Sequence, residues 1–105
     1  MDTLQAAAGF AALGSEHRLE VLRCLVRAGP GGLTIGDIQR QLDMAASTLA
    51  HHLKSLRDAG LIEQARDGRR VLSRARFAEV AALADFLLDQ CFIDVPAPVL
   101  EGSTS

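Results

Sequence analysis

The sequence predicts a single, mainly α-helical domain with one small β-hairpin. Its 105 residues, of which 49% are hydrophobic, are enough for one compact core and too few for two. Alanine and leucine are abundant, and Phe supplies all of the 4% aromatic residues, which favours helices over a large sheet. One hairpin is still expected, because two short segments flank Asp67-Gly68, a dipeptide that favours type I′ turns.

Two helices are expected before Pro30. The first, over residues 3–13, has so little polar surface that we expect burial on more than one side, and Gly14 ends it. Ser15 is suited to cap the second helix, which the stretch AGPGG ends. The apolar positions of this helix predict a core-facing stripe and place Cys24 on the charged side. The predicted stripe consists of Leu19, Leu22, Leu25 and Val26.

Two further helices, separated by a tight turn, are expected next. Thr34 and Asp37 have the spacing of a capping box, so a third helix of about two turns begins here. The fourth helix lies in STLAHHLKSLRDAGLI, residues 47–62, and ends at Ala59-Gly60. Its predicted core positions are Leu49, Leu53 and Leu56.

The hairpin and a last helix complete the order of elements. We expect the hairpin within residues 61–74, a helix from about Arg76 to Phe92, and a disordered tail at 94–105 after a domain at 1–93. The order helix, helix, helix-turn-helix, hairpin, helix is that of a winged helix-turn-helix. In this fold the second helix of the pair enters the DNA major groove and the hairpin lies along the backbone.

Charge is distributed unevenly along the chain. The formal net charge is −2, yet the segment from His51 to Arg76 has seven Lys and Arg against three Asp and Glu, a net +4, while the rest carries −6. A local positive side attracts a polyanion even when the whole protein is acidic. Together with the predicted fold, this indicates double-stranded DNA as a partner.

The exposed face of the fourth helix carries the predicted contacts to DNA. At about 100° per residue, Ser47, His51 and Lys54 cluster opposite the leucine stripe. Short hydrogen-bonding groups suit base edges or phosphates, and the methyl group of Thr48 suits thymine. Arginines at the hairpin tip would meet phosphates, although a merely solvated turn is the alternative. The predicted DNA-binding residues are Ser47, Thr48, His51, Lys54, Arg66, Arg69 and Arg70.

The adjacent residues His51 and His52 raise the question of a metal or catalytic site. Neighbouring side chains diverge by about 100° on a helix and cannot chelate one ion. We therefore expect His51 to reach DNA, and His52 to pack at the flank of the core with one nitrogen hydrogen-bonded. Because no nucleophile-base pair, phosphate loop or metal motif emerges, we expect no catalytic residue, no metal site and no enzymatic activity.

The last helix is apolar on nearly all sides. Its larger apolar side runs from Phe77 to Cys91, while Leu83 and Phe86 occupy much of the other side, and one core cannot cover both. A twofold homodimer through the first and last helices is the simplest solution. It would place two recognition helices roughly 34 Å apart, matching an inverted-repeat operator. The expected interface residues are Leu4, Phe77, Val80, Ala84, Leu87 and Leu88.

Three stretches, ALGSEHRLEVLRCLV, STLAHHLKSLRDAGLI and RDGRRV, resemble in this order the ArsR/SmtB family of bacterial winged-helix repressors. The resemblance covers roughly residues 4–92, and the middle stretch is the most specific. It implies a homodimer joined through the first and last helices that binds a promoter and leaves it when an inducer binds. It also supports the roles given above to the fourth helix and the hairpin arginines.

Departures from the family pattern argue against its metal sites. The stretch GGLTIGDIQ lacks the Cys-x-Cys pair that binds arsenite or cadmium in some members, and the last helix has Asp85 and Asp89 but no histidine for zinc. After FLLDQC, Phe92 stands where a subset has the second cysteine of an arsenical site. Ala45 stands where relatives often have a capping serine, so the fourth helix must be capped by Asp43, water or nothing.

The two cysteines leave the inducer open. Cys24 and Cys91 show no C-x-x-C spacing. Some relatives sense reactive sulfur or oxidants through one cysteine in the second helix and one in the last, which this pair imitates. The alternative for Cys91 is a small apolar residue at the dimer seam. We expect no bound cofactor, with a trivalent arsenical or a reactive sulfur species as a candidate inducer.

The function expected from the sequence is a dimeric bacterial repressor that recognises an inverted-repeat operator and is released by an inducer, with Cys91 as a candidate sensor. The alternative is a winged-helix protein-interaction module without an inducer site, whose arginines meet an acidic partner. No apolar run approaches the roughly 18 to 20 residues needed to span a bilayer, and the N-terminus lacks a signal-peptide pattern. We therefore expect a soluble, cytoplasmic protein with no membrane partner.

Overall fold

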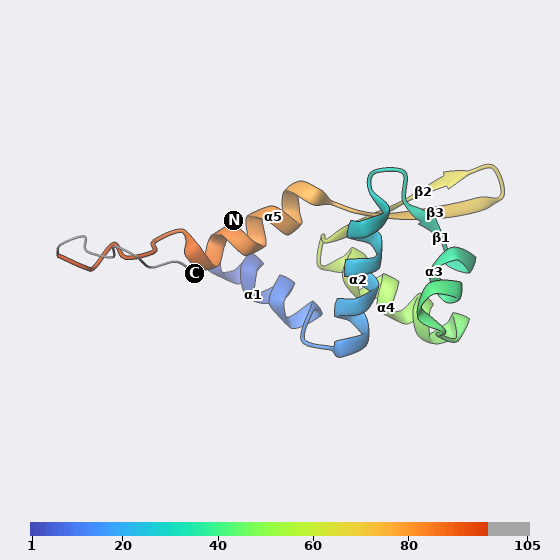
Figure 1. Cartoon of the computed structure of the whole chain (residues 1–105), viewed down its shortest axis with the longest axis horizontal. Coiled ribbons are helices and arrows are strands. Elements are labelled where there is room, and N and C mark those ends of the chain that lie inside the picture. Colours follow the sequence, from blue (N-terminus) through green and yellow to red (C-terminus); the bar gives the residue numbers. More distant parts are fainter. Residues whose placement is uncertain (97–105) are drawn as a thin grey trace.

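The computed structural model describes residues 1–96, which form five helices and a three-stranded sheet (Figure 1). This order confirms the predicted winged helix-turn-helix, with the third and fourth helices as the pair and the last two strands as the wing. Most of the predicted tail, residues 94–105, lies outside the described residues. In chain order the elements are α1 (Thr3–Ala12), α2 (Glu16–Ala28), β1 (Leu33–Thr34), α3 (Ile35–Leu42), α4 (Ala46–Asp58), β2 (Ile62–Asp67), β3 (Arg70–Ala75) and α5 (Phe77–Leu88).

Side-chain caps explain where the first three helices begin. The Asp2 carboxylate accepts a hydrogen bond of 2.7 Å from the Gln5 amide, and the Gln5 side chain accepts one of 2.8 Å from the Asp2 amide. Ser15 caps α2 as predicted. The predicted capping box of Thr34 and Asp37 is confirmed, with both hydrogen bonds at 3.1 Å. Each such cap contributes about 1 kcal/mol, so these helix starts follow from the local sequence.

The central helix α2 packs against α3, α4 and β3, and its inward face differs from the predicted one. Val21 and Cys24 are buried, whereas Leu19 and Val26 are 42% and 39% exposed. The prediction that Cys24 lies on the charged side of the helix is therefore wrong. Leu22 and Leu25 are buried as predicted, so the buried stripe of α2 is rotated about the helix axis from the predicted one rather than unrelated to it.

A third strand joins the predicted hairpin. The strand order is β1-β3-β2, and both pairings are antiparallel. Asp67 pairs with Arg70, so the loop residues are Gly68 and Arg69, and the prediction of an Asp67-Gly68 loop is wrong by one residue. Of the two loop residues, only Gly68 has a positive φ, 67°, which is the pattern of a type II′ turn rather than type I′.

Helices α1 and α5 lie side by side at the end of the molecule away from the wing (Figure 1). They approach closely at Gly9, where a Cβ would lie 3.0 Å from the Leu83 side chain. Helix α5 ends at Leu88 rather than at the predicted Phe92, whose φ of 62° is incompatible with a regular α-helix. Among the residues of α5, only Leu83 is buried.

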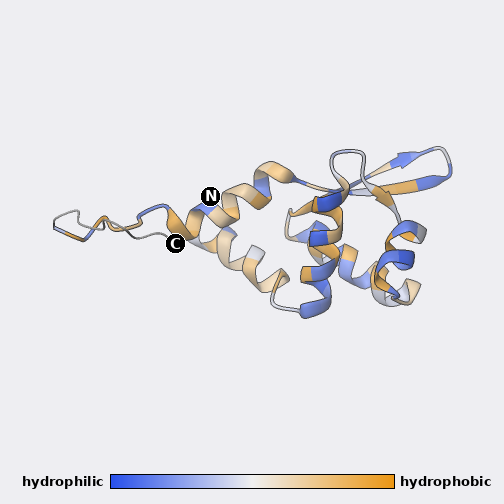
Figure 2. Cartoon of the chain, in the orientation of Figure 1, coloured by the Kyte–Doolittle hydropathy of each residue, from blue (hydrophilic) through white to orange (hydrophobic). Residues whose placement is uncertain are grey.

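The outer faces of α1 and α5 are apolar and uncovered within one chain. Figure 2 shows the hydrophobic colour along most of both helices. Leu4 is 80% exposed, and Leu87 and Leu88 are each 67% exposed. We expected α1 to be buried on more than one side, but within one chain it is buried on one face only, at Ala6 and Ala12. The prediction that one core cannot cover both faces of α5 is confirmed.

Candidate nucleic-acid interface

Helix α4 presents its polar face to solvent. Leu49, Leu53 and Leu56 are buried as predicted, and this fixes the rotation of the helix about its axis. The opposite side is fully available to a ligand, because all four predicted contact residues of this helix are exposed. These residues are Ser47, Thr48, His51 and Lys54.

The Lys54 ammonium group donates a hydrogen bond of 2.8 Å to Oδ2 of Asp58, one helical turn further on. This hydrogen bond holds the pKa of the Asp58 carboxyl below its ordinary value. Both side chains are exposed, and an exposed i, i+4 pair stabilises a helix only weakly. Lys54 can therefore exchange this carboxylate for a phosphate at little cost.

The first turn of α4 has no side-chain cap. Ala45 is the N-cap residue, with φ −66° and ψ 147°, and no side chain accepts from the first amides. Asp43, one of the candidate caps, instead ends α3 in the left-handed conformation, with φ 51°. Uncapped amides at a helix N-terminus suit a phosphate, because they point outward and the helix dipole favours negative charge.

His52 packs at the flank of the core, as predicted, but not with the predicted hydrogen bond. Its ring stacks on that of His17 in α2, with centroids 6.1 Å apart, and lies 5.8 Å from that of His51. Within the described residues its buried Nδ1 has no hydrogen-bond partner. Burial lowers the pKa of His52, and the charge of Arg18 and the neighbouring histidines add to this effect. His52 therefore joins α4 to α2 through a ring whose surroundings favour its neutral form.

We expect the wild-type protein to lose free energy of unfolding on acidification, and replacing His52 by leucine should remove this loss. With a folded-state pKa below the ordinary 6.5, the unfolded chain binds the proton first. The free energy of unfolding should then fall as the pH drops from 6.5 through the lower folded-state pKa, with no contribution from this group above 6.5. Urea unfolding at several pH values in this range measures how the free energy of unfolding changes with pH. The control His51→Leu removes only one of the lesser causes of the lowered pKa and should keep most of the pH dependence. If His52→Leu shows the same pH dependence as the wild-type protein, another group is its source.

The wing carries uncompensated positive charge at its tip. Arg66, Arg69 and Arg70 are all exposed there, as predicted. Arg70 forms an ion pair of 2.7 Å with Asp67, whereas Arg66 and Arg69 have no ion-pair partner within residues 1–96. The two unpaired guanidinium groups are the more available for phosphate contacts.

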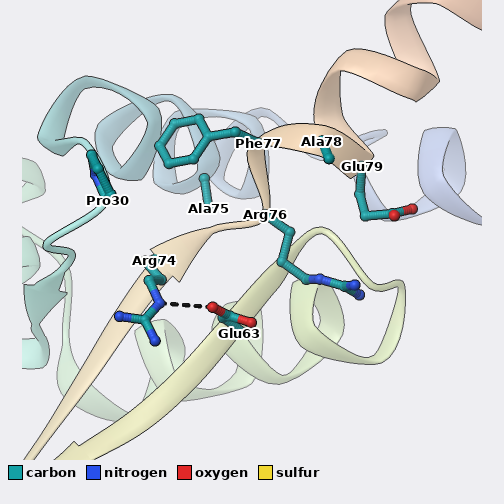
Figure 3. A pocket seen from close by; sticks show the side chains of 8 residues that line it. All are labelled: Pro30, Glu63, Arg74, Ala75, Arg76, Phe77, Ala78 and Glu79. Carbon is teal, nitrogen blue, oxygen red and sulfur yellow. Dashed lines mark hydrogen bonds and ion pairs between the residues drawn. The ribbon is translucent and has the colours of Figure 1, made fainter.

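At the base of the wing, one arginine is paired with a carboxylate and another, from α4, donates to a neutral amide. Arg74 donates a hydrogen bond of 2.7 Å to Glu63 on the paired strand, beside a hollow of about 420 Å³ (Figure 3). Arg57 of α4 donates one of 2.8 Å to Gln64 of the wing, and so ties these two elements together. This link is not evident from the sequence, because it depends on how α4 and β2 pack.

The remaining predicted site residues lie away from this surface. Cys91 is exposed beyond α5, whereas Cys24 is buried and donates from its thiol to Oε1 of Gln41 at 3.3 Å. Burial raises the pKa of the Cys24 thiol, and the charge of Arg27 opposes this only in part. Cys24 is therefore a poor nucleophile in this conformation. Of the expected interface residues, Val80 is packed against the core and the others are exposed.

The fold and this surface define a winged helix-turn-helix DNA-binding regulator. Residues 13–65 match the family model described as a helix-turn-helix domain. The transcriptional regulator YgaV of Escherichia coli K12 is 35% identical over 79 residues, covering 75% of this chain and 78% of the relative. The cadmium resistance regulatory protein CadC of Listeria innocua is 33% identical over 70 residues, covering 67% and 57%.

Solved structures agree with these relatives. An ArsR-like transcriptional regulator from Rhodococcus superposes with a TM-score of 0.73 and 30% identity, covering 87% of this chain and 82% of that one. A homodimeric winged helix-turn-helix DNA-binding domain from Mycobacterium bovis superposes with a TM-score of 0.65 and 26% identity, covering 90% and 88%. The chain belongs to the ArsR/SmtB family of transcriptional regulators. Within residues 1–96, no helix is long and apolar enough to cross a membrane.

Proposed function

We propose that the protein is a homodimeric bacterial repressor that binds an inverted-repeat operator in cytoplasmic DNA. The observation that carries the proposal is the shared exposure of the polar face of α4 and the unpaired arginines of the wing tip. In the proposed complex Ser47, Thr48 and His51 read base edges or contact phosphate in the major groove. Lys54 and the wing arginines neutralise phosphates on either side.

The uncovered apolar faces of α1 and α5 support self-association. A twofold axis would bring Leu4 of one copy and Leu87 and Leu88 of the other out of water, and burial of such side chains drives association. The homodimeric relative from Mycobacterium bovis also supports this arrangement. The rest of the proposed interface consists of Phe77, Val80 and Ala84.

The salt dependence of DNA binding tests the role of the wing. Replacing Arg66 and Arg69 by alanine should lower the slope of log K against log salt by up to about four, because the homodimer then loses four phosphate contacts and each contributes about 0.9. Fluorescence anisotropy with DNA from the region upstream of the gene measures the slope. The matched control is the double change Arg23→Ala and Arg27→Ala on α2, which should leave the slope unaltered. An unchanged slope in the wing variant would exclude the wing from the interface, and no DNA binding at low salt would favour the protein-interaction alternative.

For the inducer, the exposure of Cys91 favours it over the buried Cys24 as the group that first meets a thiol-reactive species. DNA release assays with arsenite, a persulfide, peroxide and zinc would identify the class of inducer. Release by one of the first three that is lost in Cys91→Ser supports a trivalent arsenical or a reactive sulfur or oxygen species acting at this thiol. Release that persists in this variant would exclude Cys91.

A further inference from the structure

The structure contains an apolar groove between α1, α2 and α5, at the edge of the core, where Leu22 and Leu83 reach its floor. We propose that this groove binds a small amphipathic carboxylate, with the apolar chain along the groove and the carboxylate on Arg23 and Arg27. The groove has a volume of about 380 Å³. Ligand pockets of roughly 300 to 1,000 Å³ hold small organic molecules, so this one suits a short acyl chain.

The groove has a buried floor and exposed apolar walls. Leu22 of α2 and Leu83 of α5, each 3% exposed, form the floor. Phe10, Leu19 and Val26 line the walls and are 36%, 42% and 39% exposed. Three helices thus contribute apolar side chains to one concave surface, which is the character of a site for an apolar group.

One continuous face of α2 is turned toward this groove. Its residues follow the spacing i, i+3, i+4, i+7, i+8 of a single helical face. This accounts for the two hydrophobic residues that the predicted core stripe placed wrongly, because Leu19 and Val26 face the groove instead of the core. The members of this face are Leu19, Leu22, Arg23, Val26 and Arg27.

The charge of the groove selects an anion. Arg23 and Arg27 lie one helical turn apart on the same wall. Within the part of the chain that the structure describes, neither guanidinium group has an ion-pair or hydrogen-bond partner, and no acidic side chain lines the groove. A guanidinium group binds a carboxylate through two parallel hydrogen bonds, and both arginines are exposed and open to such a ligand. The complementary ligand therefore has an apolar body and one carboxylate.

A second copy of the chain is the alternative occupant, since Val80 and Ala84 line the groove and also belong to the proposed dimer face. The most exposed leucines of that face, Leu4, Leu87 and Leu88, do not line the groove. A dimer can thus cover them while the rim of the groove on α2 stays open. An apolar partner helix would also leave the two arginines unpaired, whereas a carboxylate satisfies both.

Titration of the whole chain with octanoate and, separately, with 1-octanol tests the proposal without DNA, so its outcome is independent of operator binding. Backbone amide NMR signals of α2 and α5 at the groove should shift, and octanoate should bind at least about tenfold more tightly than octanol. In a variant with Arg23→Gln and Arg27→Gln the two affinities should converge. The matched control, Arg66→Gln with Arg69→Gln in the wing, should keep the preference for octanoate.

Equal affinities of the wild-type protein for octanoate and octanol would overturn the proposal, as would a preference that persists without Arg23 and Arg27. Val26→Glu places a carboxylate in the groove and should abolish octanoate binding without changing the oligomeric state. If this variant instead converts a dimer into a monomer in sedimentation, and octanoate causes no shifts in the wild-type protein, the groove is an interface between copies and the proposal is wrong.

Discussion

Replacing Gly32 by alanine is expected to lower the free energy of unfolding by about 3 kcal/mol, through strain and overpacking together. Gly32 has a φ of 73°, a region that side-chain-bearing residues rarely adopt, and it lies next to β1. A Cβ there would lie 2.6 Å from the Ser73 carbonyl oxygen and 3.2 Å from Cβ of Arg74. Both neighbours belong to β3, the central strand, so neither can move without disturbing the sheet. Urea unfolding followed by circular dichroism measures the change.

Two neighbouring glycines serve as matched controls for this substitution. Gly31 has no positive φ and no atom within 4 Å of a built Cβ, so Gly31→Ala should change stability by less than about 0.5 kcal/mol. Gly29 has a φ of 81° and equally open surroundings, so Gly29→Ala should show backbone strain alone, about 1 to 2 kcal/mol. If Gly29→Ala and Gly32→Ala lower the free energy of unfolding equally, the close approach of Gly32 to β3 does not contribute to the effect.

The fold was predictable from the sequence wherever local chemistry determines the structure. The capping box of Thr34 and Asp37 and the leucine stripe of α4 depend on residues within a few turns, and both are confirmed. The short strand β1 was not predicted, because it exists only through its pairing with β3. The inward face of α2 was predicted only in part: Leu22 and Leu25 are buried as predicted, but the groove beside α1 and α5 leaves Leu19 and Val26 exposed. The loop of the hairpin was misplaced by one residue, since Asp67 pairs with Arg70 instead of forming the turn.

For the candidate interface, the sequence predicted which side chains are exposed but not which charges are already paired. Helical periodicity alone places Lys54 on the outer face of α4. The wing arginines look equivalent in sequence, yet Arg70 is paired with Asp67 and Arg69 is not. The groove beside Arg23 was also beyond prediction, because its walls come from three helices that meet only in the folded chain.

Reversing the charge of Lys54 is expected to have the largest effect on DNA affinity. In the proposed complex Lys54→Glu replaces a phosphate contact by a repulsion, and like charges placed together cost several kcal/mol, so we expect operator binding to weaken about a hundredfold. The fold should be retained, because position 54 is exposed and the new i, i+4 repulsion from Asp58 costs only about 0.5 kcal/mol. Anisotropy titrations at one fixed salt concentration measure the affinity, and circular dichroism confirms the fold.

Two variants separate a local contact from a change in net charge. Arg23→Glu makes the same change in total charge on α2 and should weaken binding only slightly, since charges beyond about 10 Å are largely screened at ordinary salt. Asp58→Asn removes the carboxylate that Lys54 contacts at 2.8 Å and should tighten binding, because the ammonium group then has no competing partner to leave. If Lys54→Glu and Arg23→Glu weaken binding equally, net charge accounts for the loss and α4 is not in contact with DNA. If Asp58→Asn does not tighten binding, Lys54 keeps its ion pair with Asp58 in the complex. Lys54 then attracts DNA by its charge at a distance and does not contact a phosphate.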